Sequence, residues 1–450
     1  MKKAIAWILA AVLILTLFTG CTGKSETTPN EGAQTTNQDG NSGTNTEKGQ
    51  TVVTIWVNGG EDAYIPRVAD AFMEAHPDIK LDLLLVPQEE SLQKIMTAIS
   101  TGGTLPDIVD INLDNLGQLL NLDLWEDMEA DPYNFDVNQL LPYMPDALRN
   151  EKGELVSMMA DLTTCGVAYD RNLALEYFGT DDPDELGAMF STNQAYIDLG
   201  KQVTEQSGGT VYTFASAQDA WGMLFAEYVE EPFVKDGVLN IDNSIGECFK
   251  FVEELQKNGS LNLYEQWSSE WVNNISDSST LFYSCPLWFV DWGLAANDAT
   301  GGGRWGVMSP PSGSTSGGEI FLIPKASAPE KKQAAYTFIN WLCATPEGAR
   351  ALYENTNMLS GYAGNLSLSE DEVYYSTSTE AYGGQNVLGK FIDIAAMDST
   401  KIRPLTKYDS GIFSASVAVL SDLSQGLSAE DALQQVKETV QSKYPELTIQ

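Results

Sequence analysis

The sequence predicts an α/β protein, because short apolar strands alternate with amphipathic helices once the polar N-terminal segment ends. Residues 51–57 are β-branched and apolar, as expected of a buried strand, and residues 64–75 carry apolar side chains at helical spacing. Residues 79–86 form a second predicted strand, 91–100 a second helix and 106–110 a third strand. This order predicts a mostly parallel sheet, in which ligands bind beyond the carboxyl ends of the strands.

The alternation continues through the rest of the chain. Residues 154–170 are apolar and extended, and could run from one lobe into another. The glycine-rich stretch 301–318 is predicted to be mainly loop, and a strand follows at 319–324. Further helices are predicted at 186–206, 245–257, 331–343 and 429–442, the last with Ser428 as its N-cap.

Composition excludes several classes of function. The chain has 450 residues, enough for two domains, and 25 Lys+Arg against 63 Asp+Glu give a net charge of −38. Such a surface repels nucleic acid and anionic lipid headgroups. The single histidine, His76, stands at a predicted helix end, which argues against a histidine-based hydrolase or a zinc site. The glycine-rich loops match neither phosphate-binding glycine motif, and we expect no metal or cofactor.

The N-terminus has the features of a secretory signal. Lys2 and Lys3 precede an apolar run over residues 4–18, which is short for a transmembrane helix. Small residues before Cys21 resemble the cleavage site of bacterial lipoproteins, which implies a signal peptide over 1–20 and lipidation, with palmitate, at Cys21. The segment 21–50 has no apolar cluster and is predicted to be a disordered tether, so the expected location is the extracellular face of the membrane.

Four cysteines remain after the lipidation site, and none forms a CxxC pair. Export permits disulfides, but the wide spacing predicts no particular pairing. Each can equally serve as a small buried apolar residue. They are Cys165, Cys248, Cys285 and Cys343.

Several motifs, in order along the chain, resemble those of extracellular solute-binding proteins of the maltose-binding type, which supply the substrate to ABC importers. They are IWVNG at 55–59, GTLPDIV at 103–109, GVAYDRN at 166–172, WGVMSPP at 305–311 and AAYTFINWL at 334–342. The resemblance implies two α/β lobes joined by a hinge, with a ligand held in the cleft by closure. It also implies a lobe of 51–164 with 319–359, a lobe of 165–318 with 360–450, membrane permease subunits as partners, and a monomer.

Tryptophan is concentrated in the predicted second lobe. Aromatic rings stack on the C–H faces of sugars, whereas carboxylates and amides bind hydroxyl groups. The resemblance places Trp288 near a position that stacks on sugar, with Asp291 and Trp292 close behind it. Trp221 and Trp267 are further aromatic candidates. Trp341, on an amphipathic helix, is expected to be a core residue instead.

Polar candidates follow the predicted strands and crossings. Each stands after a strand, beside a crossing or late in the second lobe: Glu61, Asp62, Asn112, Asp114, Asp161, Thr163, Glu319, Arg403 and Tyr408. With the tryptophans they predict a binding site for a mono- or oligosaccharide, with no catalytic residue.

Three alternatives remain open. The same fold could bind a polyamine, which an acidic cleft would suit, or a peptide. A secreted glycoside hydrolase would need two placed carboxylates, but the chain shows no eightfold β/α repeat. A surface adhesin or sensor would use the same cleft without a permease.

Overall fold

A computed structural model describes residues 49–225, 231–367 and 380–449. The predicted signal peptide, Cys21 and almost all of the predicted tether lie outside these residues. Within them, no helix combines the length and the apolar character that crossing a membrane requires.

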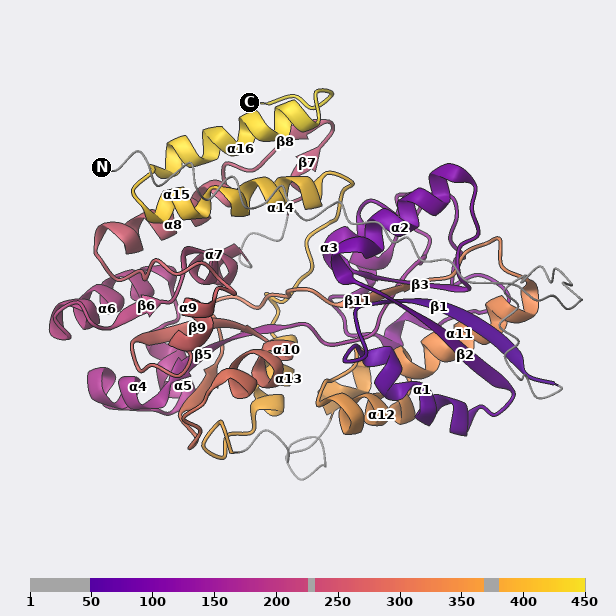
Figure 1. The fold of residues 1–450 in the computed structure, drawn as a ribbon, viewed down its shortest axis with the longest axis horizontal. Coiled ribbons are helices and arrows are strands. Elements are labelled where there is room, and N and C mark those ends of the chain that lie inside the picture. Colours follow the sequence, from indigo (N-terminus) through magenta and orange to yellow (C-terminus); the bar gives the residue numbers. More distant parts are fainter. Residues whose placement is uncertain (1–48, 226–230, 368–379, 450) are drawn as a thin grey trace, which may run out of the picture. The chain divides into compact units, whose positions relative to one another are not determined.

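The first sheet has five strands in the order β2-β1-β3-β11-β4 (Figure 1). Their bounds are β1 Thr51–Asn58, β2 Ile79–Val86, β3 Ile108–Asn112, β4 Met158–Met159 and β11 Glu319–Leu322. β1 runs parallel to β2 and β3, whereas β11 is antiparallel to β3 and β4. The direction changes at β11 because the chain re-enters this sheet after passing through the second one.

The second sheet has the order β10-β5-β9-β6. Its strands are β5 Cys165–Asp170, β6 Tyr212–Phe214, β9 Thr280–Pro286 and β10 Trp305–Met308. Only the β6–β9 pair is parallel, and the other two pairs are antiparallel. The α/β fold class is confirmed, but the prediction of a mostly parallel sheet is wrong here. A small hairpin of β7 Val234–Lys235 and β8 Val238–Leu239 stands apart.

Helices cover both faces of the first sheet (Figure 1). On one face Phe72 of α1 packs edge-on against Phe338 of α11, with ring centroids 5.0 Å apart. β1 supplies the fully buried Val53, Ile55 and Val57 beneath them. The helices are α1 Tyr64–Ala75, α2 Gln88–Thr101, α3 Leu113–Leu116, α11 Pro329–Ala344 and α12 Pro346–Thr356.

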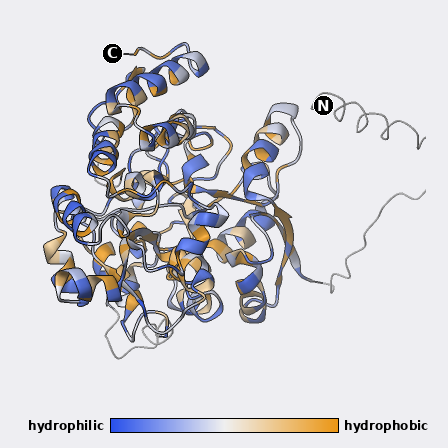
Figure 2. Cartoon of the chain, turned by 60° about the vertical axis from the view of Figure 1, so that its left-hand side comes forward, coloured by the Kyte–Doolittle hydropathy of each residue, from blue (hydrophilic) through white to orange (hydrophobic). Residues whose placement is uncertain are grey.

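The second core contains an aromatic cluster in which Phe190, Tyr196 and Phe282 pack against one another. Hydrophobic residues, orange in Figure 2, gather on the strands and inner helix faces. The surrounding helices are α4 Arg171–Phe178, α5 Pro183–Met189, α6 Asn193–Gln206, α7 Ala217–Phe225, α8 Ile245–Lys257, α9 Ser269–Asn274, α10 Leu287–Phe289, α13 Val387–Ala395, α14 Asp409–Ala418, α15 Leu420–Ser424 and α16 Ala429–Lys443. Short helical turns are Val137–Gln139, Pro145–Leu148, Val290–Ala295 and Ala363–Ser367.

Most predicted elements are confirmed within a few residues, with two corrections. The predicted helix 186–206 is interrupted after α5, because the Thr192 hydroxyl accepts a hydrogen bond from Ala195 N and starts α6 afresh. The predicted loop 301–318 contains strand β10, a buried strand that glycines flank. Ser428 caps α16 as expected, and Trp341 is buried in the core.

The four cysteines are buried and form no disulfide with one another, as expected of small apolar residues. His76 ends α1 and stacks on Phe72, with ring centroids 4.6 Å apart, so it is a helix-end residue. Both observations agree with the interpretation that these side chains are structural.

Three chain segments that connect the two sheets run beside one another. Thr164 and Thr315 form an antiparallel bridge, and Ser316 N donates to Thr163 O at 2.9 Å. Leu162 N donates to Leu359 O at 2.6 Å, which ties in the third segment.

Candidate functional site

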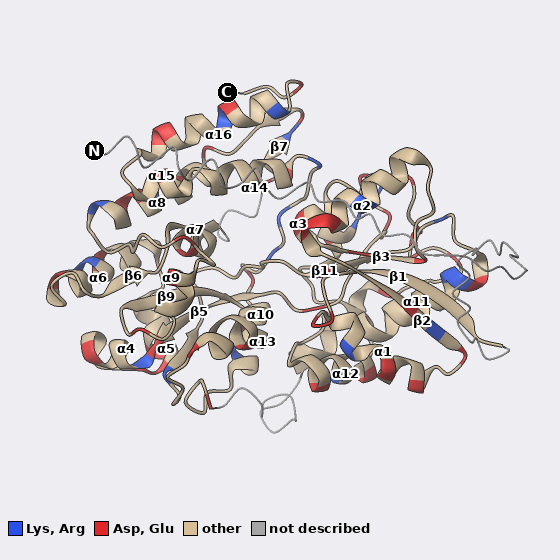
Figure 3. Ribbon diagram, viewed as in Figure 1, with Lys and Arg blue, Asp and Glu red and all other residues tan. Residues whose placement is uncertain are grey.

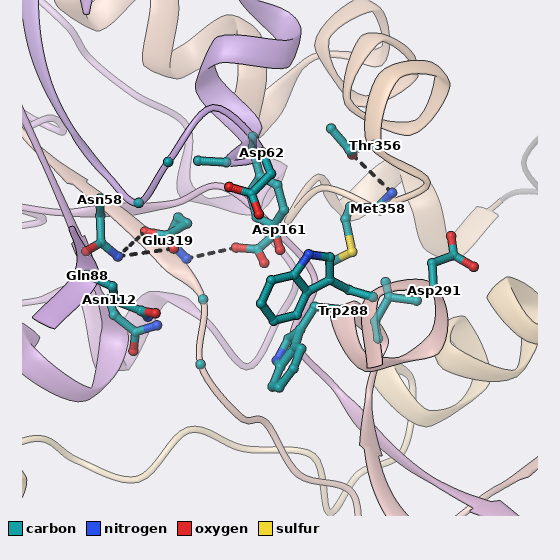
Figure 4. A pocket seen from close by; sticks show the side chains of 18 of the residues that line it. Asn58, Asp62, Gln88, Asn112, Asp161, Trp288, Asp291, Glu319, Thr356 and Met358 are labelled. Carbon is teal, nitrogen blue, oxygen red and sulfur yellow. Dashed lines mark hydrogen bonds between the residues drawn. The ribbon is translucent and has the colours of Figure 1, made fainter. Parts of the chain in front are cut away.

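A cavity of about 990 Å³ is lined by residues from both sheets and their connections. This volume falls at the upper end of the range for small-molecule sites. One wall comes from the loops after β1 and β3 and from the start of β11. The opposite wall comes from the segment around α10, and Figure 4 shows Trp288 projecting from it towards Asp161.

Three tryptophans form an aromatic platform on this second wall. The rings of Trp267 and Trp288 are nearly parallel, with centroids 6.1 Å apart, and Trp292 lies 6.5 Å from Trp267. Trp267 is 46% exposed and Trp292 62%, the largest exposed fractions among the described tryptophans. Apolar rings left open to solvent in a cavity are typical of a ligand-binding surface.

The backbone of Trp267 is in the left-handed region, with φ 69°. A bulky residue pays about 1–2 kcal/mol for this conformation. The conformation is held by neighbours. Trp267 packs against Trp271, whose indole N–H donates to Asp219 Oδ2 at 2.7 Å, and Gln266 Nε2 donates to Asp219 Oδ1 at 2.9 Å.

Asp219 is a buried carboxylate that holds Gln266 and Trp271, on either side of Trp267, in place through these hydrogen bonds. It also accepts a hydrogen bond from Ser216 Oγ at 2.6 Å. Burial raises its pKa to about 6, against the partly compensating effect of its hydrogen bonds. It does not line the cavity, so it positions the platform without contacting a ligand.

The first wall carries a cluster of carboxyl groups, Asp110, Asp161 and Glu319, which we call the carboxyl cluster. Asn58 Nδ2 donates to both oxygens of Glu319 at 3.2 and 3.0 Å, and Asn58 N donates to Asp110 at 2.8 Å. Glu319 N donates to Asp161 Oδ1 at 2.9 Å. β1, β3 and β11 are neighbours in the sheet, which explains why residues from distant parts of the sequence meet here.

Protonation of the carboxyl cluster is strongly perturbed. Burial raises the pKa of Asp161 to about 6 and that of Glu319 to about 7, the latter with a further contribution from the charge of Asp161. Burial and the facing Glu319 raise the pKa of Asp110 well above its usual range. The cluster therefore retains protons near neutral pH, because adjacent buried carboxylates cannot all ionise.

Nine of the predicted site residues line the cavity together. They come from both predicted lobes: Asp62, Asn112, Asp114, Asp161, Trp267, Trp288, Asp291, Trp292 and Glu319. Asn112 caps α3 by accepting from Asp114 N at 3.0 Å. Asp291 accepts a hydrogen bond from Asn357 Nδ2 at 2.8 Å, a contact between the two walls.

Five predicted site residues do not line the cavity. Glu61 is an exposed neighbour of the lining residue Asp62, and Thr163 is fully buried beneath Gly318. Trp221 stacks on Phe225 in the second core and is 2% exposed.

The other two predicted residues that do not line the cavity belong to the late part of the chain. Arg403 Nη1 forms an ion pair with Asp409 Oδ2 at 2.7 Å, and the guanidinium lies over the Phe233 ring. Tyr408 packs edge-on against Tyr444. Both side chains therefore pack within the fold instead of facing the cavity.

Sequence reasoning missed several lining residues. Asn58 ends β1 and Tyr64 begins α1, on either side of the loop that holds Asp62, so the strand-end rule could have found them. Asn357 and Met358 gave no such signal, because only the fold brings the end of α12 to the cavity. Arg67 is the one basic lining residue among the described part of the chain.

A two-sheet α/β fold with a ligand-sized cavity between its parts is typical of solute-binding proteins. The chain matches the profile of the bacterial extracellular solute-binding protein family over residues 67–375. It belongs to this family.

Individual relatives are distant. A lactose-binding protein of Rhizobium radiobacter is 21% identical over 369 residues, covering 77% of this chain and 82% of that protein. The structure of an extracellular solute-binding protein of family 1 aligns with a TM-score of 0.76 at 18% identity, covering 87% of this chain and 99% of that one.

Two further structures share the fold. The galacto-N-biose-/lacto-N-biose I-binding protein of a Bifidobacterium longum ABC transporter aligns with a TM-score of 0.71 at 15% identity, covering 90% of this chain and 100% of that one. The sugar-binding protein MalE of Xanthomonas citri gives 0.68 at 17%, covering 87% and 98%. These relatives are binding proteins, and the predicted fold class and family are confirmed.

Proposed function

We propose that this protein captures a mono- or oligosaccharide in the cavity and presents it to the permease of an ABC importer without chemical conversion. The aromatic platform facing the carboxyl cluster is the observation that carries the proposal. Stacking on Trp267, Trp288 and Trp292 suits the C–H faces of sugars, and carboxyl and amide groups suit their hydroxyls. The relatives named for lactose, lacto-N-biose and other sugars support the same class of ligand.

Capture takes place by closure of two lobes about the connecting segments. The lobes comprise residues 51–164 with 319–359, and 165–318 with 360–450. Closure needs only a few backbone dihedral angles to change where short segments join two cores. The hydrogen bond between Asn357 and Asp291 is a contact that such a movement would make or break.

The protein works as a monomer at the outer face of the membrane. Residues 1–20 serve as a signal peptide, Cys21 carries the lipid anchor, and the segment to residue 50 is the tether. Mass spectrometry of the protein from membranes tests this directly. A diacylglyceryl group and palmitate on an N-terminal Cys21 are expected, and an intact residue 1 would contradict the anchor.

The ligand class is tested by thermal shift of the purified protein against sugars, polyamines and peptides. A ligand present at 100 times its Kd stabilises the folded state by about 2.7 kcal/mol. Trp288→Ala should abolish the shift. Trp56→Ala, at a half-buried tryptophan that does not line the cavity, should keep it. A response to spermidine or peptides alone would refute the carbohydrate assignment.

A further inference from the structure

The carboxyl cluster has no positively charged partner among the described residues, although buried carboxylates are normally paired with one. Asp110 and Asp161 are 2% and 1% exposed, and Glu319 is half-buried. None of the ion pairs formed among the described residues includes any of the three. The chain is acidic throughout (Figure 3), so an acidic cavity alone would mean little. Burial without a cation is different, because it costs free energy that surface carboxylates do not.

The titratable groups that interact with the cluster are neutral, and Arg67, the one basic residue among the described lining residues, acts on Asp291 instead. The phenol of Tyr64 on α1 forms a hydrogen bond with the Asp161 carboxylate, and the phenol of Tyr143 and the thiol of Cys343 on α11 lie within the electrostatic field of the cluster. Burial first, then these carboxylates, raises the pKa of each group above its usual value. None of them can supply the missing positive charge.

Two lining residues of the cavity also have buried oxygens without a hydrogen-bond partner among the described residues. These are Asp161 Oδ2 and Asn58 Oδ1, on side chains that are 1% and 4% exposed. The orientation of the Asn58 amide is fixed, because its Nδ2 donates to Glu319. Behind them, Asp110 Oδ1 is a third unpartnered oxygen. The two oxygens that line the cavity, on Asp161 and Asn58, are acceptors, so this end of the cavity suits a group that offers more than one donor.

We infer that the ligand is an amine-bearing sugar whose ammonium group binds at the carboxyl cluster while its ring stacks on the aromatic platform. This inference rests on the proposed function. An ammonium group supplies three N–H donors and a positive charge, whereas a hydroxyl supplies one donor and no charge. It therefore satisfies the unpartnered acceptors and compensates the buried carboxylates together.

The test compares ligands that differ only at the amine. Calorimetry of the purified protein at pH 7 uses glucosamine and galactosamine mono- and disaccharides, their N-acetylated forms and the neutral parent sugars. Acetylation keeps the ring and removes the charge. The aminated form should bind about tenfold or more tightly than both others, the factor expected for one charge-assisted hydrogen bond.

Variants locate the amine. Asp161→Asn keeps an acceptor for Glu319 N but removes the charge, and should weaken the aminated sugar about tenfold while leaving neutral forms within about threefold. Glu61→Gln, at an exposed carboxylate that neighbours the cavity but does not line it, is the matched control and should change little. Melting temperatures without ligand exclude misfolding as the cause.

Proton release gives an independent readout. A bound cation favours the ionised carboxylates, so binding should release protons near pH 6.5, measured as a buffer-dependent binding heat. Tighter binding of neutral or N-acetylated sugars would overturn the inference and leave the carbohydrate function intact. Binding of spermidine without any sugar would overturn both. Failure of every aminated sugar to bind would overturn the inference.

Discussion

The left-handed backbone of Trp267 allows a sharp test of the aromatic platform. Replacing this residue with glycine or with alanine removes the same indole ring. The two variants differ in backbone strain, because only glycine adopts φ near 69° without an energetic penalty. The difference in the free energy of unfolding between the two variants measures the backbone strain at residue 267. The loss of ligand affinity that both variants share measures the contribution of the indole ring.

The magnitudes follow from exposure and packing. Trp267 is 46% exposed, so roughly 130 Å² of its side chain is covered, mainly by Trp271, Trp288 and Phe289. At about 25 cal/mol per Å², the loss of that contact costs about 3 kcal/mol. Glycine recovers about 1–2 kcal/mol of backbone strain, for a net destabilisation of about 1–2 kcal/mol. Alanine recovers none, and its usual entropic advantage of about 0.4–1 kcal/mol offsets only part of this.

The assay is urea denaturation of both variants together with calorimetry on the sugar identified by the thermal-shift screen. We expect the glycine variant to be more stable than the alanine variant by about 1 kcal/mol, and both to lose affinity at least tenfold. An alanine variant as stable as the glycine variant would refute the strain argument. Unchanged affinity in both would refute the role of Trp267 in the platform.

Three further changes test other parts of the structure. Asp219→Asn should make the free energy of unfolding less dependent on pH. The pKa of Asp219 in the folded wild type, about 6, lies above the ordinary 3.8, so its ionisation destabilises the wild type by up to about 3 kcal/mol as the pH rises from about 4 through 6. Parallel unfolding curves for the two proteins across this range would contradict the burial of Asp219. Gly318→Ala should cost about 2 kcal/mol or more in urea denaturation, since φ is 120° and a Cβ would lie 2.8 Å from Met159 Cε; a change below about 0.5 kcal/mol would show that the segment adapts. Arg403→Met should lower stability by about 3 kcal/mol by leaving its buried aspartate partner unpaired, yet keep ligand affinity; weaker binding with unchanged stability would return Arg403 to the site.

The first part of the fold was accessible to sequence reasoning because its signals are local. Residues 51–57, 64–75 and 79–86 each carry an uninterrupted pattern of period two or 3.6, and the structure has β1, α1 and β2 at almost those bounds. β10 was missed because its four residues lie among glycines, and only pairing with β5 makes them a strand. The antiparallel pairs of the second sheet were missed for a related reason, since strand direction depends on how often the chain crosses between the sheets.

The site was predictable where a general rule links chain position to space. Asp62 and Asn112 follow strands of one sheet, and their common edge brings them to the cavity. Trp221 and Trp288 are alike in sequence, both within apolar segments of the second part of the chain. The side chain of Trp221 on α7 is buried in the core, whereas Trp288 is the middle residue of the short helix α10, whose other two residues are buried.

The sequence by itself determined which side chains are available: the chain is acidic, has a single histidine at a helix end, and contains many tryptophans and carboxylates. It also determined the α/β alternation, because periodicity acts over a few neighbouring residues. Only the tertiary structure decided that Asn58, Asp110, Asp161 and Glu319 meet, since β11 returns from the second sheet and pairs with β3, which itself pairs with β1. The burial of a carboxylate depends on all the groups packed around it. The same residue type is therefore either a solvated surface group or a buried group with a shifted pKa, and the pattern of neighbouring residues in the sequence does not show which.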